Sequence, residues 1–489
     1  MAQWTTTLDV PREGELPVFV RIAAAITDDI RRGRLRAGDA LPGSRPLATS
    51  LGVHRNTVLA AYRELGAEGW ITTAEAKGTF VAADIPRPAR SAAGAPTIAV
   101  RPAYDLPAGD EQLDAHAVAA DARLRGAKGV MTLGGGVPDV RLLPADELAR
   151  AMRRVLKQKA VAALSYGEPQ GPLALRASLA TMIAATRGIP AGPEHVLVAR
   201  GSQMGIDLAA RTLIRPGDRV LVEAMGYWPA WAALRRAGAV LVPVPVDAHG
   251  IDVAAVTRLV GEGNVRGLYV TPHHQFPTTV MLAPARRLAL LALAKAHRFW
   301  ILEDDYDHEF HYEGRPILPL ASADTHGVVV YVGTLSKVLA PGLRLGFVVA
   351  PTPLVERLAW TRRFIDRQSD QILGLALADL IEDGSIQRHV RRAKRIYAAR
   401  RAELAALLAE HLGAELSFTL PNGGTAIWAK VHGVSADAWA ARALERGLVL
   451  QPGRQFAFDG RPRPFFRIGF AQHDAKEARE AIRRLVSSR

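Results

Sequence analysis

The sequence contains no cysteine. This absence excludes disulfide bonds, metal sites built on thiolates and catalysis by a thiol nucleophile. No apolar run reaches the roughly 18 residues that a membrane-spanning helix needs. The first residues, from Met1 to Thr5, lack the basic segment and apolar stretch that mark a signal peptide. We therefore expect a cytoplasmic protein with no membrane association.

The length of 489 residues is too great for one ordinary domain and predicts two or three. Apolar residues make up 49% of the chain, which is ample for a large core. The formal net charge of +14 fits an anionic partner such as DNA. An arginine-rich composition can also reflect genomic habit, so the charge alone does not identify the partner.

The N-terminal region carries the pattern of a small helical domain. Apolar residues recur every four positions from Val18 to Ile30, and Gly33 ends that helix. Ser44 is expected to be the N-cap of a short helix that runs through Leu51. A three-residue turn leads to a helix from about Arg55 to Glu68, and residues 71–73 and 79–81 then read as a hairpin. This order predicts a winged helix-turn-helix.

The helix that begins at Arg55 would be the recognition helix, whose first residues reach base edges in the major groove. Those residues are Arg55, Asn56 and Thr57. Arginine pairs with guanine and asparagine with adenine through two hydrogen bonds each, so these side chains suit direct readout. Arg45 would lie near a phosphate or a base. The alternative is a helix-turn-helix used only for packing, but seven arginines and one acid between residues 31 and 63 favour DNA.

Residues 84–128 are rich in proline, alanine and arginine and predict an inter-domain linker. From Val130 onward short apolar strands alternate with long helices, which predicts an α/β fold with a mostly parallel sheet covered on both faces. Ligands of such sheets bind beyond the carboxyl ends of the strands. The expected strands are 196–198, 220–222, 268–270, 300–302, 328–332 and 345–349.

One lysine stands on a turn between two of these strands. The turn Gly333-Thr334-Leu335-Ser336 precedes Lys337, and Arg344 follows shortly after. A lysine held in a medium of low dielectric loses part of its preference for the charged form and becomes a nucleophile that forms Schiff bases. The hydroxyls and the arginine could face a phosphate. The alternative is a solvated surface loop.

An acidic segment, Glu303 to Asp307, follows the strand at residues 300–302. Asp304 and Tyr306 are two residues apart at a strand end and therefore point to the same side. A pyridoxal ring needs a carboxylate at its pyridine nitrogen and a phenol near its 3-oxygen. The alternative is an acidic cluster that caps the next helix or holds a metal ion, although no metal site is expected overall.

These motifs, in this order, resemble the fold-type I aminotransferases, and in particular the aminotransferase-like half of MocR-type regulators in the GntR family. The resemblance extends from about Val18 to the C-terminus. It includes the GntR-type DNA-binding pattern, in residues 41–45, 51–58 and 77–81, where His54 replaces a frequent serine that caps the helix. It implies DNA contacts by Arg45, Arg55, Asn56, Thr57, Arg63, Lys77 and Gly78.

The resemblance also implies a cofactor, pyridoxal phosphate (PLP), bound to Lys337 as a Schiff base. Asp304 would pair with the pyridine nitrogen and Tyr306 would contact the ring oxygen. The phosphate would be held by Thr334, Ser336 and Arg344, and by the helix that opens at Gly201, Ser202 and Gln203.

Several further positions carry expectations about the ring and an effector. The resemblance places Tyr227 against the pyridine ring, whereas the alternative is an ordinary core aromatic. Either His274 or Gln275 would approach the ring oxygen, or both would only fix their loop, and Thr279 stands where the family often has glycine. Arg467 would hold the carboxylate of an effector.

The C-terminal part, from about residue 386, is expected to be a smaller subdomain. Its segment from Arg388 to Arg401 carries seven lysines or arginines and no acid, which fits a solvated face, a dimer contact or a second DNA track. Members of the family that respond to γ-aminobutyrate carry an arginine where this chain has Pro229. That compound is therefore a poor candidate effector.

Together these features predict three segments: a DNA-binding domain over residues 1–83, a linker over 84–128 and an aminotransferase-like body over 129–489. The expected function is a transcription regulator that senses an amine, an amino acid or PLP, and the family resemblance implies that it is a homodimer. The alternative is an active PLP-dependent aminotransferase with an appended DNA-binding domain.

Overall fold

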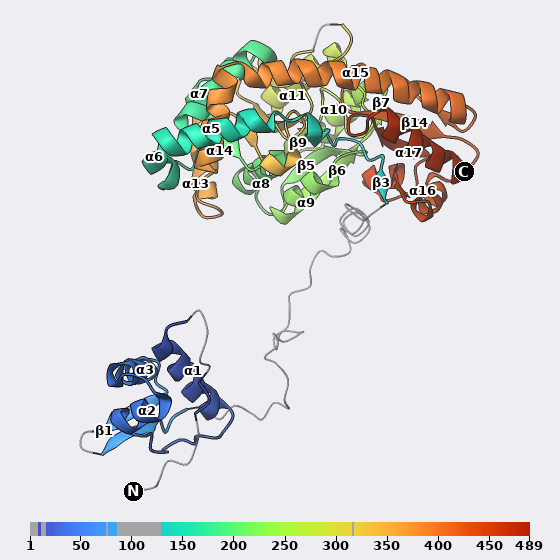
Figure 1. The fold of residues 1–489 in the computed structure, drawn as a ribbon. Helices are drawn as coiled ribbons and strands as arrows, with labels where there is room; N and C mark the ends of the chain where they lie inside the picture. The colour runs from blue at the N-terminus through green and yellow to red at the C-terminus, as the bar shows by residue number, and fades with distance from the viewer. Residues whose placement is uncertain (1–7, 11–15, 75–76, 86–128, 315–316) are drawn as a thin grey trace. The chain divides into compact units, whose positions relative to one another are not determined.

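The chain divides into two compact units, Met1–Ala108 and Gly109–Arg489 (Figure 1). The structure, a computed structural model, describes residues 8–10, 16–74, 77–85, 129–314 and 317–489. Nearly all of the predicted linker lies outside these residues. Within them, no helix is long and apolar enough to cross a membrane.

Among its described residues, the first unit has three helices and a two-stranded antiparallel sheet, which confirms the predicted winged helix-turn-helix. Its elements are α1 (Val18–Arg31), α2 (Ser44–Leu51), α3 (Arg55–Ala67), β1 (Ile71–Ala74) and β2 (Gly78–Val81). The core forms where the apolar stripe of α1 meets α3, and its fully buried members include Ile22, Val58 and Leu65. Amphipathic spacing at three and four residues is what turns these side chains to one side.

The expected N-cap of α2 was wrong by one residue. Gly43 is the cap and Ser44 is the first helical residue. The Ser44 hydroxyl accepts instead from Arg55 Nε at 3.2 Å, which joins the starts of the two helices. At α3, His54 replaces the usual serine as cap, since its Nδ1 accepts from the Asn56 backbone N–H at 3.3 Å.

The second unit is built on a seven-stranded sheet of order β4-β12-β11-β10-β9-β5-β6, in which only the β11–β12 and β12–β4 pairings are antiparallel. The predicted mostly parallel sheet is thus confirmed. The strands are β4 (Val196–Ala199), β5 (Arg219–Glu223), β6 (Val240–Val244), β9 (Val265–Val270), β10 (Trp300–Asp305), β11 (Val329–Thr334) and β12 (Gly346–Val349). The edge strand β6 was not expected.

Helices cover both faces of this sheet because the strands bury side chains on both. One face, which we call face A, carries Ile301 and Tyr331. Its helices are α5 (Ala145–Gln158), α6 (Ala160–Leu164), α7 (Leu173–Arg187), α10 (Val253–Gly261), α11 (Pro284–His297), α12 (Leu320–Ala323) and α14 (Gln371–Glu382). The opposite face B carries Tyr269 and Leu302. It is covered by α8 (Ser202–Leu213), α9 (Trp228–Arg236) and α13 (Thr352–Arg363).

The C-terminal subdomain has its own antiparallel sheet, of order β13-β14-β17-β16, and its own core around Trp439 and Phe466. Its elements are α15 (Ser385–Leu412), β13 (Leu416–Ser417), β14 (Ala426–Val431), α16 (Ala436–Glu445), β15 (Leu448–Val449), β16 (Gln451–Pro452), β17 (Phe465–Gly469) and α17 (Ala475–Ser487). The long helix α15 runs along the unit and joins the two cores, from Ile386 in one to Leu412 in the other (Figure 1).

An N-terminal segment of the second unit also belongs to this subdomain. β3 (Met131–Thr132) pairs in parallel with β15, and Leu133 lies in the C-terminal core. Two further short strands, β7 (Val246–Asp247) and β8 (Gly250–Ile251), form a separate hairpin. The 3₁₀ turns are η1 (Val140–Leu142), η2 (Pro193–His195), η3 (Pro341–Leu343) and η4 (Gly453–Phe456). The pairing of β3 with β15 brings the segment that follows β3 close to Lys337, at the carboxyl edge of the seven-stranded sheet.

The basic stretch on α15 has two kinds of residue. Arg388, Arg391, Arg392 and Arg395 are exposed. Arg400 and Arg401 instead turn inward to form ion pairs, with Asp139 at 2.9 Å and with Glu313. The stretch is therefore partly a solvated face and partly a structural support.

Candidate functional site

Lys337 lies on the turn that follows β11, at the carboxyl edge of the sheet. Its Nζ is half-buried and donates to the Gly136 carbonyl oxygen at 2.6 Å. The Thr334 hydroxyl organises this turn: it donates to Leu345 O at 3.0 Å and accepts from the Ser336 N–H at 3.0 Å. The Ser336 hydroxyl is buried and has no hydrogen-bond partner. Because buried polar atoms are normally paired, a ligand oxygen at this position would give the Ser336 hydroxyl its missing hydrogen-bond partner.

Asp304 is the last residue but one of β10, lies on face B and is held by a residue that was not expected from the sequence. The Tyr269 hydroxyl donates to Asp304 Oδ2 at 2.8 Å, whereas Asp304 Oδ1 is buried without a partner. Burial raises the pKa of Asp304 to about 7; the Tyr269 hydrogen bond and Lys337 oppose this rise, and Asp305 adds to it. A cationic N–H donor at Oδ1 would remove this penalty. A buried tyrosine needs a partner for its hydroxyl, and that was the only signal for Tyr269 in the sequence.

Gly201, which precedes α8, and Arg344, which precedes β12, lie close together. Gly201 has φ +78° and is the N-cap of α8, and Arg344 has φ +50°. A Cβ on Gly201 would lie 3.1 Å from Arg344 Nη2, which itself donates to Arg200 O at 3.0 Å. Ser202 is the first residue of α8, so its backbone N–H points out of the helix end, as an anion site requires. Gln203 donates to Pro229 O at 2.9 Å, and its Oε1 has no partner.

Aromatic rings cluster around Phe276, in the loop that follows β9 at the carboxyl edge of the sheet. Phe276 meets Tyr227, Tyr306 and Phe456 edge to face, at centroid distances of 5.5, 5.9 and 5.4 Å. The Tyr306 hydroxyl donates to His274 O at 3.0 Å. Burial raises the pKa of Tyr306 well above its usual value, so this phenol stays a donor at neutral pH. Tyr227 is the N-cap residue of α9 and packs against the face-B core as well.

The loop after β9 uses its polar residues mainly to hold itself. Gln275 is fully engaged: its Nε2 donates to Met225 O and to Phe276 O, and its Oε1 accepts from Thr278. His274 Nδ1 lies 2.8 Å from Asp307 Oδ1, and its Nε2 has no partner. Thr279 adopts φ +65°, so the turn keeps the left-handed conformation that glycine would take there.

Arg467, on β17 of the C-terminal subdomain, is 1% exposed, and its Nε and Nη1 have no hydrogen-bond partner. Its guanidinium carbon lies 4.6 Å from the centroid of the Phe276 ring. Gly135 and Gly136 line it closely: a Cβ on Gly135 would lie 2.0 Å from Arg467 Nη1. A Cβ on Gly136 would lie 3.5 Å from that atom and 3.6 Å from Lys337 Nζ. Lys337 and Arg467 therefore flank the same glycine, and this glycine segment was not recognised from the sequence.

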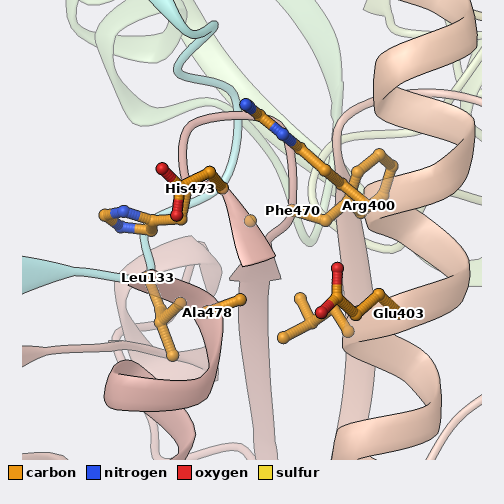
Figure 2. A pocket seen from close by; sticks show the side chains of 9 residues that line it. Leu133, Arg400, Glu403, Phe470, His473 and Ala478 are labelled. Atoms are coloured by element: carbon orange, nitrogen blue, oxygen red, sulfur yellow. The ribbon is translucent and has the colours of Figure 1, made fainter. Parts of the chain in front are cut away.

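A separate hollow of the C-terminal subdomain has room for about one water molecule. Figure 2 shows side chains that line it, which include Leu133, Arg400, Glu403, Phe470, His473 and Ala478. Lys337 and Asp304 are not among its lining residues, so the hollow is distinct from the lysine site.

The residues expected to contact DNA lie on three elements of the first unit. Arg55 and Asn56 begin α3 and are exposed, and Thr57 is half-buried. Arg45 is exposed on α2 beside Ser44, which accepts from Arg55. Arg63 is exposed two turns along α3, and Lys77 and Gly78 are exposed at the tip of the hairpin. Exposed side chains are thus present at the start of the expected recognition helix, on the preceding helix and at the tip of the hairpin.

Comparison with known proteins gives both halves a family. Residues 20–81 match the bacterial regulatory proteins of the gntR family, and residues 128–485 match the class I and II aminotransferases. Over 98% of this chain and 95% of its own length, the probable rhizopine catabolism regulatory protein MocR of Rhizobium meliloti is 32% identical. The HTH-type transcriptional regulator TauR of Rhodobacter capsulatus is 33% identical over 95% of each chain.

Among solved structures, α-aminoadipate aminotransferase from Thermus thermophilus, in complex with N-(5′-phosphopyridoxyl)-L-leucine, has a TM-score of 0.70 and 29% identity. The match covers 76% of this chain and 95% of that enzyme. The unpartnered atoms of Asp304 and Ser336 beside Lys337 fit PLP, which is the cofactor. The chain therefore belongs to the MocR-type regulators of the GntR family, PLP-binding transcription regulators in which a winged helix-turn-helix is joined to a fold-type I aminotransferase-like body.

Proposed function

We propose that the chain senses an amine, an amino acid or PLP in its body and thereby changes how its helix-turn-helix binds an operator. The observation that carries this proposal is Arg467: a buried, partly unpaired guanidinium beside the same glycine as Lys337. A buried arginine with free donors suits a carboxylate. The exposed start of α3 on the same chain supplies the output.

The site residues divide into three roles in this proposal. Lys337 holds PLP covalently, and Asp304, kept in place by Tyr269, accepts from the pyridine nitrogen. The phosphate would be held by backbone donors at Gly201, Ser202 and Gln203, by the Ser336 hydroxyl and by the Arg344 guanidinium. Thr334, whose hydroxyl already donates to Leu345 O, would shape the turn around it. Tyr227, Tyr306 and His274 line the ring, and Gln275 fixes the loop around them. Bound PLP would supply a carbon that is joined to the Lys337 amine and can be transferred to the amine of an effector, with release of the lysine amine.

The effect on DNA is a coupling between two sites, and it must be reciprocal. An effector changes operator affinity only if it binds two arrangements of the protein with different affinities. Operator binding then changes effector affinity by the same factor. We place the DNA-binding domain at residues 1–83, the linker at 84–128 and the body at 129–489, in a cytoplasmic protein. γ-Aminobutyrate is not the expected effector, because Pro229 stands at the position of the diagnostic arginine.

Arg467→Gln is expected to weaken the binding of amino acids about 100-fold without releasing PLP, because it removes the charge that pairs with a carboxylate. The measurement is a spectrophotometric titration of the PLP-loaded protein with amino acids and with the matching amines. The control is Arg463→Gln, since Arg463 is paired with Asp459 near the surface of the same subdomain. Equal affinities for amino acids in wild type and Arg467→Gln would remove Arg467 from the effector site.

In protein freed of PLP, Asp304→Asn is expected to be more stable than wild type, by a margin that grows with pH. The pKa of Asp304 is raised from 3.8 to about 7 by burial. Between these values the folded wild type holds a proton that the unfolded chain has lost, so its stability falls as pH rises, and a neutral amide escapes this loss. Denaturant unfolding should show the margin growing by about 1–3 kcal/mol between about pH 5 and about pH 7. A constant margin would contradict the raised pKa.

We also propose a homodimer, which a surface of the body supports. Large apolar side chains are exposed there on and near α6 and at the end of α13: Val161, Leu164, Tyr166, Trp360 and Phe364. Arg367 stacks on Tyr166 at 4.2 Å and joins the two segments. A contiguous apolar patch of this kind usually marks an interface. Sedimentation that gave the mass of a single chain would contradict the dimer.

An active aminotransferase is the second candidate. Lys337, Asp304 and Arg467, the residues that such chemistry requires, are all present and converge on one edge of the sheet. Turnover of an amino acid with a 2-oxo acid separates the two functions. We expect at most residual turnover, because an enzyme has no use for the exposed start of α3.

A further inference from the structure

A cluster of histidine and aspartate side chains lies at the same edge of the sheet as Asp304, but on the opposite face. It has no role in the function proposed above. Successive residues of a strand point to opposite faces of the sheet. Asp304 therefore faces Tyr269 on face B, and Asp305 points to face A, where it accepts from the Tyr331 hydroxyl at 2.8 Å. Two histidines meet Asp305 there: His308 from the following turn and His273 from the loop after β9.

These three side chains are close enough to share one ion. Each offers a ligand atom, and the three atoms lie within 4.8 Å of one another. His308 Nδ1 lies 2.9 Å from Asp305 Oδ2, and the rings of His273 and His308 are 4.7 Å apart. Tetrahedral zinc with bonds of about 2.0–2.1 Å separates its ligand atoms by about 3.4 Å. Small side-chain shifts would therefore close the site.

The cluster is buried, yet several of its polar atoms have no hydrogen-bond partner. His273, Asp305 and His308 are 1%, 2% and 5% exposed. Both ring nitrogens of His273 and Oδ1 of Asp305 make no hydrogen bond, and the neighbour of His308 Nδ1 is the Asp305 carboxylate itself. Buried polar atoms are normally paired, so three unpaired atoms in one place call for a common partner.

The surroundings orient the cluster as they do in known metal sites. His308 Nε2 lies 3.2 Å from Thr186 O, so this nitrogen carries a proton, and in a neutral ring Nδ1 would have a lone pair for an ion. Asp305 is fixed by Tyr331, whose hydroxyl accepts from Arg187 Nε at 2.7 Å. The charge of Arg187 is taken up by Glu309, with which it forms a buried ion pair.

We propose that His273, Asp305 and His308 bind one divalent transition-metal ion of the zinc class. Two imidazoles and one carboxylate form a donor set that zinc and cobalt accept and that magnesium or calcium, which prefer oxygen, do not. Three protein ligands leave a fourth position for water. The ion would link the end of β10, which carries Asp304, to the loop after β9, which carries His274. The competing arrangement is a metal-free ion pair between His308 and Asp305.

The test is the metal content of the full chain, made without an affinity tag in medium that contains zinc or cobalt ions. Growth with the metal allows the ion to enter during folding, since a buried site exchanges slowly. After dialysis against a weak chelator, elemental analysis gives the metal bound per chain. The variants are His273→Gln and His308→Gln, and the control is His326→Gln, which changes an exposed histidine outside the cluster.

We expect about one ion per chain in wild type and in His326→Gln, and a loss of at least about tenfold in each cluster variant. Cobalt-grown wild type should also show the strong visible bands of tetrahedral cobalt, which the cluster variants lack. Retention of PLP by the variants shows that they fold. If they do not fold, the wild type alone decides the matter through its metal content and cobalt bands. Wild type with almost no metal, or a folded His273→Gln with the full amount, would overturn the site in favour of the ion pair.

Discussion

Replacing Lys337 by alanine is expected to abolish the visible absorption band of lysine-bound PLP and to leave the protein folded. The band requires a covalent bond between the cofactor and Nζ, and alanine offers no amine. The fold should survive because Lys337 lies on a turn, where its Nζ donates to Gly136 O. Loss of such a hydrogen bond costs about 1 kcal/mol, a small part of the stability of a domain.

The measurement is the absorption spectrum of wild type and variant after incubation with excess PLP and removal of the unbound cofactor. Lys157→Ala is the control, since Lys157 is exposed on α5 and also loses an amine. Thermal unfolding of both variants shows whether the fold is kept. An unchanged band in Lys337→Ala would mean that another group holds PLP, and it would remove the central residue of the proposed site.

Replacing Arg55 by alanine is expected to weaken specific operator binding strongly and to leave PLP binding intact. Arg55 begins α3, is exposed and is steered by the Ser44 hydroxyl at 3.2 Å. An arginine that reads a base edge contributes about 1–3 kcal/mol of discrimination, which is about 5- to 150-fold in affinity. Binding to unrelated DNA should fall much less, because it depends on the summed charge of many contacts.

The measurement is a titration of labelled operator and of scrambled DNA at two salt concentrations. Arg32→Ala is the matched control, since Arg32 is an exposed arginine of the same unit whose charge is paired with Asp28. The control should keep its preference for the operator. An Arg55→Ala protein with wild-type preference would show that the recognition helix is misplaced.

Local sequence patterns were sufficient to predict the elements that carry the site. Gly52 at φ +65° ends α2, and the spacing from Val58 to Leu65 gave the buried side of α3. Short apolar strands followed by polar residues located Asp304 and Lys337 at one edge, because parallel strands end on the same side of a sheet. Such a pattern shows both where a strand lies and at which end its polar residues follow. The edge of the sheet that carries Asp304 and Lys337 could therefore be predicted from local sequence.

Contacts between distant segments could not be predicted in this way. Gly136 meets Lys337 and Arg467 only because β3 pairs with β15, and nothing local to the glycines indicates this. The Tyr269 hydroxyl reaches Asp304 from a neighbouring strand. His273 and Asp305 come together for the same reason, across two strand ends. In each case the partner is chosen by the topology of the sheet.

The proposed regulation requires a coupling between the lysine site and operator binding, and measurement of DNA affinity tests this coupling most directly. Affinity for DNA from upstream of the gene is measured for the PLP-free and the PLP-loaded protein, and for the loaded protein with a panel of amino acids and amines. We predict that at least one of these additions changes the affinity of wild type by about 5-fold or more. The same addition should leave Lys337→Ala unchanged. Identical affinities under every condition would contradict the proposed sensor.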